Sequence, residues 1–351
     1  TISTLLQGKK CSLTEAKDVI DISSEIEFLS LYPIINKDSK LLKSQNSPKI
    51  DPKLSYLSFT PGQCISTISL GDLEVSQWKM CREFGRRGSC QGEFEFARGI
   101  AAPQPGEIAV ADVYNQRVMI RSNEGKYKKL IPLYSYPQDV AAICNHDNQL
   151  VVVDDTKYVK VFDKKNKLAF QFPTVPQSEV DRTEVNLCSV AVRKDGTILV
   201  GDVKRMVWTE HRPNDGQLLH TVPVPTPPWF LAVDDYTDRV IVNGVNEQRV
   251  YVVSANDTAQ SIIEPTIDGQ SVQVCSGVCS DKSGIYIAVS NRLGYGHIHH
   301  YDLDGIFLAC LAQGLQFPYG ITFTSDGQLA VADRFSIKMY HKMRRHQNDT
   351  E

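Results

Sequence analysis

The stretch HIHHY at residues 297–301 contains the one cluster of histidines in the sequence. Side chains alternate along a β-strand, so His297 and His299 are expected on one face and His300 on the other. Two histidines on one face can begin a metal site, but a catalytic zinc ion usually has three protein ligands. No third ligand is evident at a matching position elsewhere. The sequence therefore predicts a surface strand here and no metal site.

Three glycines, Gly85, Gly88 and Gly92, have the composition of a phosphate-binding loop but not its spacing. They match neither G-x-x-x-x-G-K-S/T nor G-x-G-x-x-G, and no helix follows whose N-terminus could receive a phosphate. We therefore expect a turn at these residues. No cofactor site is predicted in this chain.

Three carboxylates, Asp112, Asp202 and Asp333, each end an apolar run. Carboxylates that converge could support catalysis, but these occupy the same place in a repeated pattern. Repetition favours a structural hydrogen bond to the adjoining turn, with Arg117 or Arg249 as a further partner. No Ser-His-Asp or Cys-His combination is evident, so no catalytic residue is predicted.

The pattern around these aspartates occurs six times. Each copy contains a short run of small and β-branched residues, a turn, an apolar run and a third, alternating run. The apolar runs end at Asp112, Asp154, Asp202, Asn243, Ser290 and Asp333, a period of about 40–48 residues. Such a period with several short strands per copy is typical of propeller blades. The sequence predicts an all-β fold, a six-bladed β-propeller.

The strands of each copy have distinct characters. The small first runs, such as GIAA at 99–102 and GITF at 320–323, suit a crowded innermost strand, and the continuous apolar second runs suit strands covered on both faces. The sixth copy ends near Tyr340, before a fourth strand. We expect residues 78–84, WKMCREF, to supply that strand, close the ring and remove an exposed edge.

The run FGRRGSCQGEFEFARGIA at 84–101, followed by IAVADVYNQRVMI at 108–120, resembles the NHL repeat. The signature of that repeat is a Gly-Ile-Ala-Val strand, a Val-Ala-Asp strand end and an Asn-x-x-Arg-Val turn. The resemblance covers residues 78–341 and is strongest in the first and last copies. Asn243 and Ser290 depart from it, because each replaces the aspartate.

Residues 1–35 are expected to form a helix. Ser12 and Glu15 have the spacing of a capping box, and Val19, Ile22 and Leu29 lie on one apolar stripe that ends before Pro33. This helix is interpreted either as the end of a coiled coil, which would support a homodimer, or as a helix packed on the propeller. Residues 36–75 are predicted to be a linker with a short strand pair, 76–343 the propeller, and 344–351 a polar tail.

A helix, a linker and an NHL-like ring together resemble the end of tripartite-motif (TRIM) NHL proteins. The resemblance implies upstream RING and B-box domains with bound zinc and ubiquitin-ligase activity, so the full-length protein is expected to be a RING-type E3 ligase. The absence of an initiator Met at Thr1 agrees with a longer protein. None of those zinc ligands occurs in this chain, which is itself expected to be no enzyme.

Composition narrows the function classes. The formal net charge of −3 argues against a uniformly basic nucleic-acid binder, and no apolar run approaches the roughly 20 residues of a membrane helix. The nine cysteines are scattered without a CxxC pair, which favours buried free thiols in a reducing compartment. We therefore predict a cytoplasmic location and no membrane partner.

Loops that enter the inner strand, and loops that join the second and third strands, open onto one face of a propeller. Cations and aromatics are frequent at these positions. The predicted partner-binding face consists of Arg98, Asn115, Gln116, Tyr136, Lys157, Tyr158, Lys204, Arg205, Trp229, Phe230, Asn246, Gln248, Arg292, Tyr295, Tyr319, Arg334 and Phe335.

This mixture suits protein hot spots, which are rich in Trp, Tyr and Arg, and also looped RNA, whose bases stack on aromatic rings. The structural alternative is that Tyr136, Phe230 and Tyr319 close the ends of the core. We predict a non-catalytic recognition module that binds protein partners, including ubiquitination substrates, because a strong basic excess is lacking. RNA binding on the same face is the first alternative. A metal-dependent propeller lyase or lactonase is the second.

Overall fold

The computed structural model describes residues 57–60, 72–143, 148–244, 247–254, 259–291 and 295–344. The predicted helix at 1–35, most of the linker and residues 345–351 of the polar tail lie outside the described residues. The chain divides into two compact units, Gln77–Met343 and the remainder, Thr1–Ser76 with Arg344–Glu351. In the second of these, β1 (Leu57–Thr60) pairs antiparallel with the start of β2 (Asp72–Phe84). No helix among the described residues is long and apolar enough to cross a membrane.

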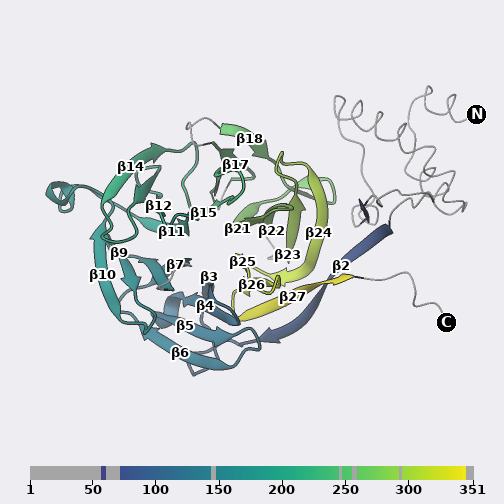
Figure 1. Cartoon of the computed structure of the whole chain (residues 1–351), viewed down its shortest axis with the longest axis horizontal. Helices are drawn as coiled ribbons and strands as arrows, with labels where there is room; N and C mark the ends of the chain where they lie inside the picture. The colour runs from purple at the N-terminus through teal and green to yellow at the C-terminus, as the bar shows by residue number, and fades with distance from the viewer. Residues whose placement is uncertain are drawn as a thin grey trace, which may run out of the picture. The chain divides into compact units, whose positions relative to one another are not determined.

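The main sheets of residues Gln77–Met343 are six antiparallel sheets arranged in a ring (Figure 1). From the inside outward, the first three blades are β3 (Ala97–Gln104), β4 (Glu107–Asp112), β5 (Arg117–Ser122) and β6 (Tyr127–Pro132); β7 (Pro137–Ile143), β8 (Gln149–Asp154), β9 (Tyr158–Phe162) and β10 (Leu168–Pro173); and β11 (Leu187–Val192), β12 (Ile198–Asp202), β13 (Val207–His211) and β14 (Leu218–Pro223). The last three are β15 (Phe230–Val233), β16 (Val240–Asn243), β17 (Val250–Val253) and β18 (Ala259–Ile263); β21 (Val274–Asp281), β22 (Gly284–Ser290), β23 (Tyr295–Tyr301) and β24 (Phe307–Gln316); and β25 (Pro318–Phe323), β26 (Leu329–Asp333), β27 (Ser336–Arg344) and β2. A small hairpin, β19 (Thr266–Ile267) and β20 (Gln270–Ser271), and two 3-10 turns, Val113–Asn115 and Gln177–Glu179, complete the described elements.

The sixth blade is closed by the strand predicted to close it. β2 lies beside β27, which joins segments from the two ends of the chain (Figure 1). The thiol of Cys81 donates to the carbonyl of Met339 at 3.3 Å, and the hydroxyl of Ser336 donates to the carboxylate of Glu83 at 2.7 Å. The prediction for residues 78–84 is confirmed, and the edge of β27 is covered.

The core lies between the blades. Its hydrophobic clusters combine residues of neighbouring sheets, such as Val110 of β4 with Ile337 of β27, and Val151 of β8 with Val200 of β12. Every residue of β12 and of β22 is buried, as predicted for second strands covered on both faces.

The innermost strands meet where the sequence places glycine. A Cβ on Gly277 would lie 1.9 Å from the carbonyl oxygen of Tyr319 in the next blade, and one on Gly320 would lie 2.4 Å from that of Arg98. A side chain at either position would force two blades apart. The prediction of a crowded innermost strand is therefore confirmed, and glycine is required for close approach of two backbones.

The aspartates that end the second strands are structural. Asp112, fully buried, accepts hydrogen bonds from the backbone amides of Glu95 and Phe96, from the side chain of Asn115 and from Nε of Arg117 at 2.9 Å. Each such bond fixes the chain that enters the blade to the turn that follows β4. The predicted role of Arg117 is confirmed.

The prediction for Arg249 is wrong. Its guanidinium pairs with Glu264 at 2.8 Å on the surface; the fourth blade has Asn243 where the first, second, third and sixth blades have aspartate, and the residue paired with Asn243 is Val250. The amide of Asn243 instead donates to the carbonyl of Ser276 in the next blade.

Candidate binding site at the mouth of the central channel

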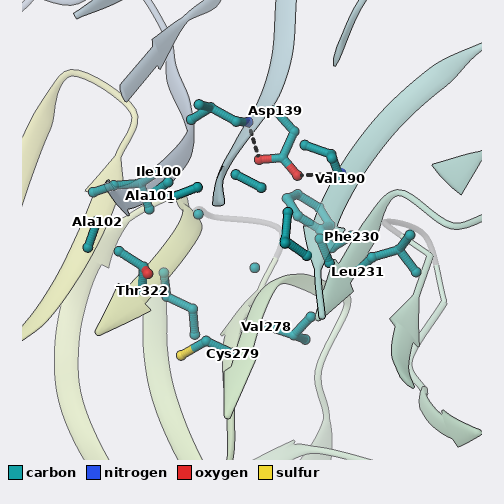
Figure 2. A pocket seen from close by; sticks show the side chains of 18 of the residues that line it. Ile100, Ala101, Ala102, Asp139, Val190, Phe230, Leu231, Val278, Cys279 and Thr322 are labelled. Atoms are coloured by element: carbon teal, nitrogen blue, oxygen red, sulfur yellow. Dashed lines mark hydrogen bonds between the residues drawn. The ribbon is translucent and has the colours of Figure 1, made fainter. Parts of the chain in front are cut away.

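The inner strands surround a channel along the axis of the propeller. A cavity of about 270 Å³ lies in this channel, and Figure 2 shows the side chains that line it. Most of its wall is formed by small and aliphatic residues, such as Ala101, Val190 and Val278. Among the described lining residues, Asp139 and Cys279 are the two with titratable side chains.

Asp139 is held in the channel wall by two backbone amides. Its Oδ1 accepts from the amide of Val140 at 2.9 Å and its Oδ2 from the amide of Val190 at 3.0 Å, so it links β7 to β11 (Figure 2). Burial raises the pKa of Asp139 from 3.8 to about 6, although the amide of Val190, the Arg98 charge and the amide of Val140 lower it.

A second, wider pocket of about 560 Å³ lies beside the entrance of this channel. The two cavities are neighbours, because residues that line one lie one or two positions from residues that line the other at four inner strands, as Gln138 does beside Asp139 and Tyr319 beside Gly320. This mouth pocket is lined by Phe96, Arg98, Val113, Tyr114, Tyr136, Gln138, Asp155, Trp229 and Tyr319. These residues come from the starts of β3, β7, β15 and β25 and from turns between second and third strands.

The aromatic rings of the mouth pocket form a connected surface. Phe96 contacts Tyr319 edge-on with centroids 4.8 Å apart, and its ring lies 5.3 Å from that of Tyr114. Tyr114 meets Tyr136 edge-on at 6.5 Å. Tyr114 is 62% exposed and Tyr136 is 42% exposed, so these two rings are available to a partner. Large apolar groups grouped on a surface in this way often mark an interaction site.

A buried arginine lies at the base of these rings. Arg98 is 5% exposed, and its guanidinium lies over the rings of Trp229 at 5.7 Å and Phe230 at 5.4 Å. Its Nη1 donates to the backbone carbonyl of Gln138 at 3.1 Å and to the side-chain oxygen of the same residue. The mouth pocket therefore combines a fixed positive charge with an aromatic wall, an environment that favours a carboxylate or an aromatic group.

The structure brings four of the predicted face residues into the mouth pocket: Arg98, Tyr136, Trp229 and Tyr319. Phe230 is buried in the core and lines the channel, as the structural alternative predicted for it. Arg334 is exposed on the same side of the molecule, with its guanidinium over Phe317 at 5.2 Å and Phe335 at 4.8 Å. Burial raises the pKa of Tyr319, and the charges of Arg98 and Arg334 lower it.

Other predicted cations are bonded to neighbouring groups of the propeller. Lys157 donates to the carbonyl of Val180 at 2.7 Å, and Lys204 pairs with Glu184 at 3.1 Å. Arg205 donates to the buried carboxylate of Asp202, so it serves the third blade as Arg117 serves the first. Asn115 is likewise bonded to Asp112 and to the carbonyl of Gly88.

The remaining face residues lie outside the mouth pocket. Gln116 adopts the left-handed conformation at the end of a 3-10 turn, Tyr158 is half-buried in β9, and Gln248 and Tyr295 are exposed. Asn246 and Arg292 lie outside the described residues.

Sequence reasoning missed five members of the pocket: Phe96, Val113, Tyr114, Gln138 and Asp155. Tyr114 lies two residues after Asp112, in the turn between β4 and β5 that also contains the predicted face residues Asn115 and Gln116. Its position in the repeat could therefore have identified it. Asp155 accepts the backbone amide of Tyr136 at 2.9 Å and thereby positions that ring.

Fold and mouth pocket together define a β-propeller whose channel entrance is lined by aromatic residues. No protein-family model and no curated protein matches the sequence. Among solved structures, the chain is similar to a protein of unknown function from Bacteroides thetaiotaomicron, with 12% identity, 78% of each chain covered and a TM-score of 0.58. A virginiamycin B lyase from Staphylococcus aureus has 11% identity, 77% of this chain and 89% of that chain covered, and a TM-score of 0.50.

A streptogramin B lyase structure has 11% identity, with 76% of this chain and 98% of that chain covered and a TM-score of 0.49. At 11–12% identity, the matches to the Bacteroides protein and to the virginiamycin B lyase show the propeller fold and nothing finer.

Proposed function

We propose that this propeller is a recognition module that binds a segment of a protein partner in the mouth pocket. The observation that carries the proposal is the joining of exposed Tyr114 and Tyr136 to buried Arg98 at the channel entrance. Exposed tyrosines on a rigid backbone add contact area at little entropic cost, and a desolvated guanidinium adds specificity. A partner segment with an aromatic or acidic side chain fits this chemistry.

A protein partner is favoured over RNA by the charges around the pocket. RNA binding needs cations that can reach phosphates. Lys157 and Arg205 of the predicted face are bonded to groups of the propeller itself, and Asp155 adds a carboxylate to the pocket. Arg98 lies too deep to track a phosphate backbone, since it is 5% exposed.

The NHL-like residues of the first and last repeats support a ubiquitination substrate as the partner, with ligase activity in domains outside this chain. A propeller lyase or lactonase receives less support. The three converging histidines or carboxylates that would favour it do not occur among the described residues that line the channel, where Asp139 is the one carboxylate.

The test is selection of peptides from a random display library by the purified chain, followed by measurement of their affinities. Tyr114→Ala is expected to weaken the selected peptides by about 10-fold or more, as truncation of a central aromatic does. Tyr236→Ala is the matched control, because Tyr236 is 63% exposed and lies outside the pocket.

Equal affinities in parent and Tyr114→Ala would rule out the mouth pocket as the peptide site. A random RNA pool, tested at two salt concentrations, forms the second arm. Selective, salt-sensitive RNA binding that is lost in Tyr114→Ala, without peptide binding, would replace the protein partner with RNA.

A further inference from the structure

The histidine cluster of the fifth blade acquires a third member in the folded chain. His297 and His299 lie on β23, and Cys310 lies on β24, where it pairs with His299 across the two strands. One potential ligand atom from each of the three side chains lies within 4.8 Å of the other two. The sequence offered no third ligand at a matching position of another blade; pairing of β23 with β24 places Cys310 of the same blade beside the two histidines.

The sequence predicted a surface strand at these histidines, but the structure buries most of the cluster. His299 is 2% exposed and Cys310 is 8% exposed, while His297 is partly open to solvent. His299 lies edge-on to Phe307 at 5.2 Å, and both Phe307 and Tyr301 belong to the core between the fourth and fifth blades. The cluster thus has one protected side and one side through which an ion can enter.

His299 is already oriented for ligation. Its Nδ1 is hydrogen-bonded to the hydroxyl of Tyr301 at 3.2 Å, which leaves Nε2 as the ring nitrogen available to a metal. Metal-binding histidines usually have such a partner on the other ring nitrogen. His300 takes no part, because it lies on the opposite face of β23 and stacks on Tyr286 at 4.3 Å.

We propose that His297, His299 and Cys310 form a binding site for one zinc ion. Two imidazoles and one thiolate are ligands that Zn²⁺ prefers. None of these three residues lines the mouth pocket or the channel. Ligand atoms of a tetrahedral zinc site lie about 3.3–3.6 Å apart, as zinc–nitrogen and zinc–sulfur bond lengths require. The three groups need to close by about 1 Å, which small side-chain rotations can supply.

Binding is a ligand exchange without oxidation or reduction. The thiol of Cys310 now donates to the carbonyl of Ala312 at 3.4 Å. On binding, its proton passes to solvent and a zinc–sulfur bond forms, while each imidazole contributes a nitrogen lone pair. Water would complete the fourth position of a tetrahedral ion.

The ion would join two strands where their pairing is irregular. The register between β23 and β24 shifts on both sides of Ile298 and again between His300 and Tyr301. A zinc ion bound to both strands would hold this part of the fifth blade together, and binding to the folded state alone would stabilise the propeller.

The test is titration of the metal-free, full 351-residue chain with CoCl₂, which adopts zinc geometry and has a visible spectrum, followed by displacement with ZnCl₂. The expected result is one equivalent of tetrahedral cobalt with a thiolate charge-transfer band, bleached by zinc. Cys310→Ala should abolish that band, and His297→Gln should weaken Co²⁺ by at least about 10-fold. Cys275→Ala, at a buried thiol outside the cluster, and His300→Gln, at a histidine outside the cluster, should leave the charge-transfer band and the Co²⁺ affinity unchanged.

Two results would overturn the proposal. One is a folded parent chain that shows no charge-transfer band at millimolar Co²⁺. The other is a band that persists in Cys310→Ala, which would assign the thiolate to another cysteine. Should Cys310→Ala fail to fold, His297→Gln decides, because this partly exposed position tolerates change and an unchanged Co²⁺ affinity there contradicts the site.

Discussion

Replacing Gly277 by alanine isolates the steric requirement of the innermost strands. The added Cβ would lie 1.9 Å from the carbonyl oxygen of Tyr319, 2.9 Å from its carbonyl carbon and 3.0 Å from Cα of Gly320. All three are backbone atoms of the next blade and cannot rotate away. Non-bonded carbon and oxygen atoms need about 3.4 Å, so the fifth and sixth blades must separate by more than about 1 Å.

The expected loss in the free energy of unfolding is about 3–5 kcal/mol. Overpacking by one methyl group in a tight core costs about 1–3 kcal/mol, and the rigid backbone places this case at or above the upper end of that range. Alanine also reduces the entropy of the unfolded chain, which returns about 0.4–1 kcal/mol. The same displacement would move Tyr319 away from Phe96 and weaken peptide binding in the mouth pocket.

Gly327→Ala is the matched control. Gly327 has a φ of +77°, and no atom lies within 4 Å of its added Cβ, so this change introduces backbone strain without a clash. Its cost is about 1 kcal/mol. Both variants are measured by guanidinium chloride denaturation, followed by tryptophan fluorescence and circular dichroism. The reasoning is refuted if Gly277→Ala loses no more stability than Gly327→Ala.

Three further changes test other parts of the molecule. Asp139→Asn removes a carboxylate whose pKa is raised to about 6, so the native parent chain binds the carboxyl proton more tightly than the unfolded chain does. The free energy of unfolding of the parent should therefore fall by up to about 3 kcal/mol as the pH rises from 4 to 7. Urea denaturation across that range should show no such fall in the variant. A parallel pH dependence in both chains would contradict the assignment. Arg117→Met leaves the buried carboxylate of Asp112 without its cation and should cost about 3–5 kcal/mol, whereas Arg249→Met, at an exposed ion pair, should cost less than about 1 kcal/mol in the same assay. Equal costs would show that the Asp112 pair is not structural. Trp78→Ala removes a half-buried ring that contacts Phe323 at 6.0 Å and should lower the thermal midpoint by several degrees; an unchanged midpoint would show that this contact does not stabilise ring closure.

Much of the architecture could be predicted because its signals are local. Each repeat consists of a run of small residues, a turn and an apolar run that usually ends in aspartate, and it specifies one blade within about 45 residues. Similar blades then close into a ring. The role of Arg117 was also readable, since it lies five residues after Asp112 in the same repeat. In the fourth blade the residue that pairs with Asn243 is Val250, so Arg249 lies one position away from the place of Arg117 and pairs with Glu264 on the surface.

The amino-acid sequence by itself determined the number of blades, the covered second strands and the closure by β2, because each follows from periodicity or from an unpaired edge. The tertiary structure alone decided which side chains meet. Residues as far apart in the sequence as Phe96 and Tyr319 meet in the mouth pocket because the inner strands begin at the same end of the channel. Cys310 reaches His299 through the register of β23 and β24, which depends on bulges that no sequence period records. Contacts between strands are set by pairing and packing across the chain, so their chemistry became visible only in the folded protein.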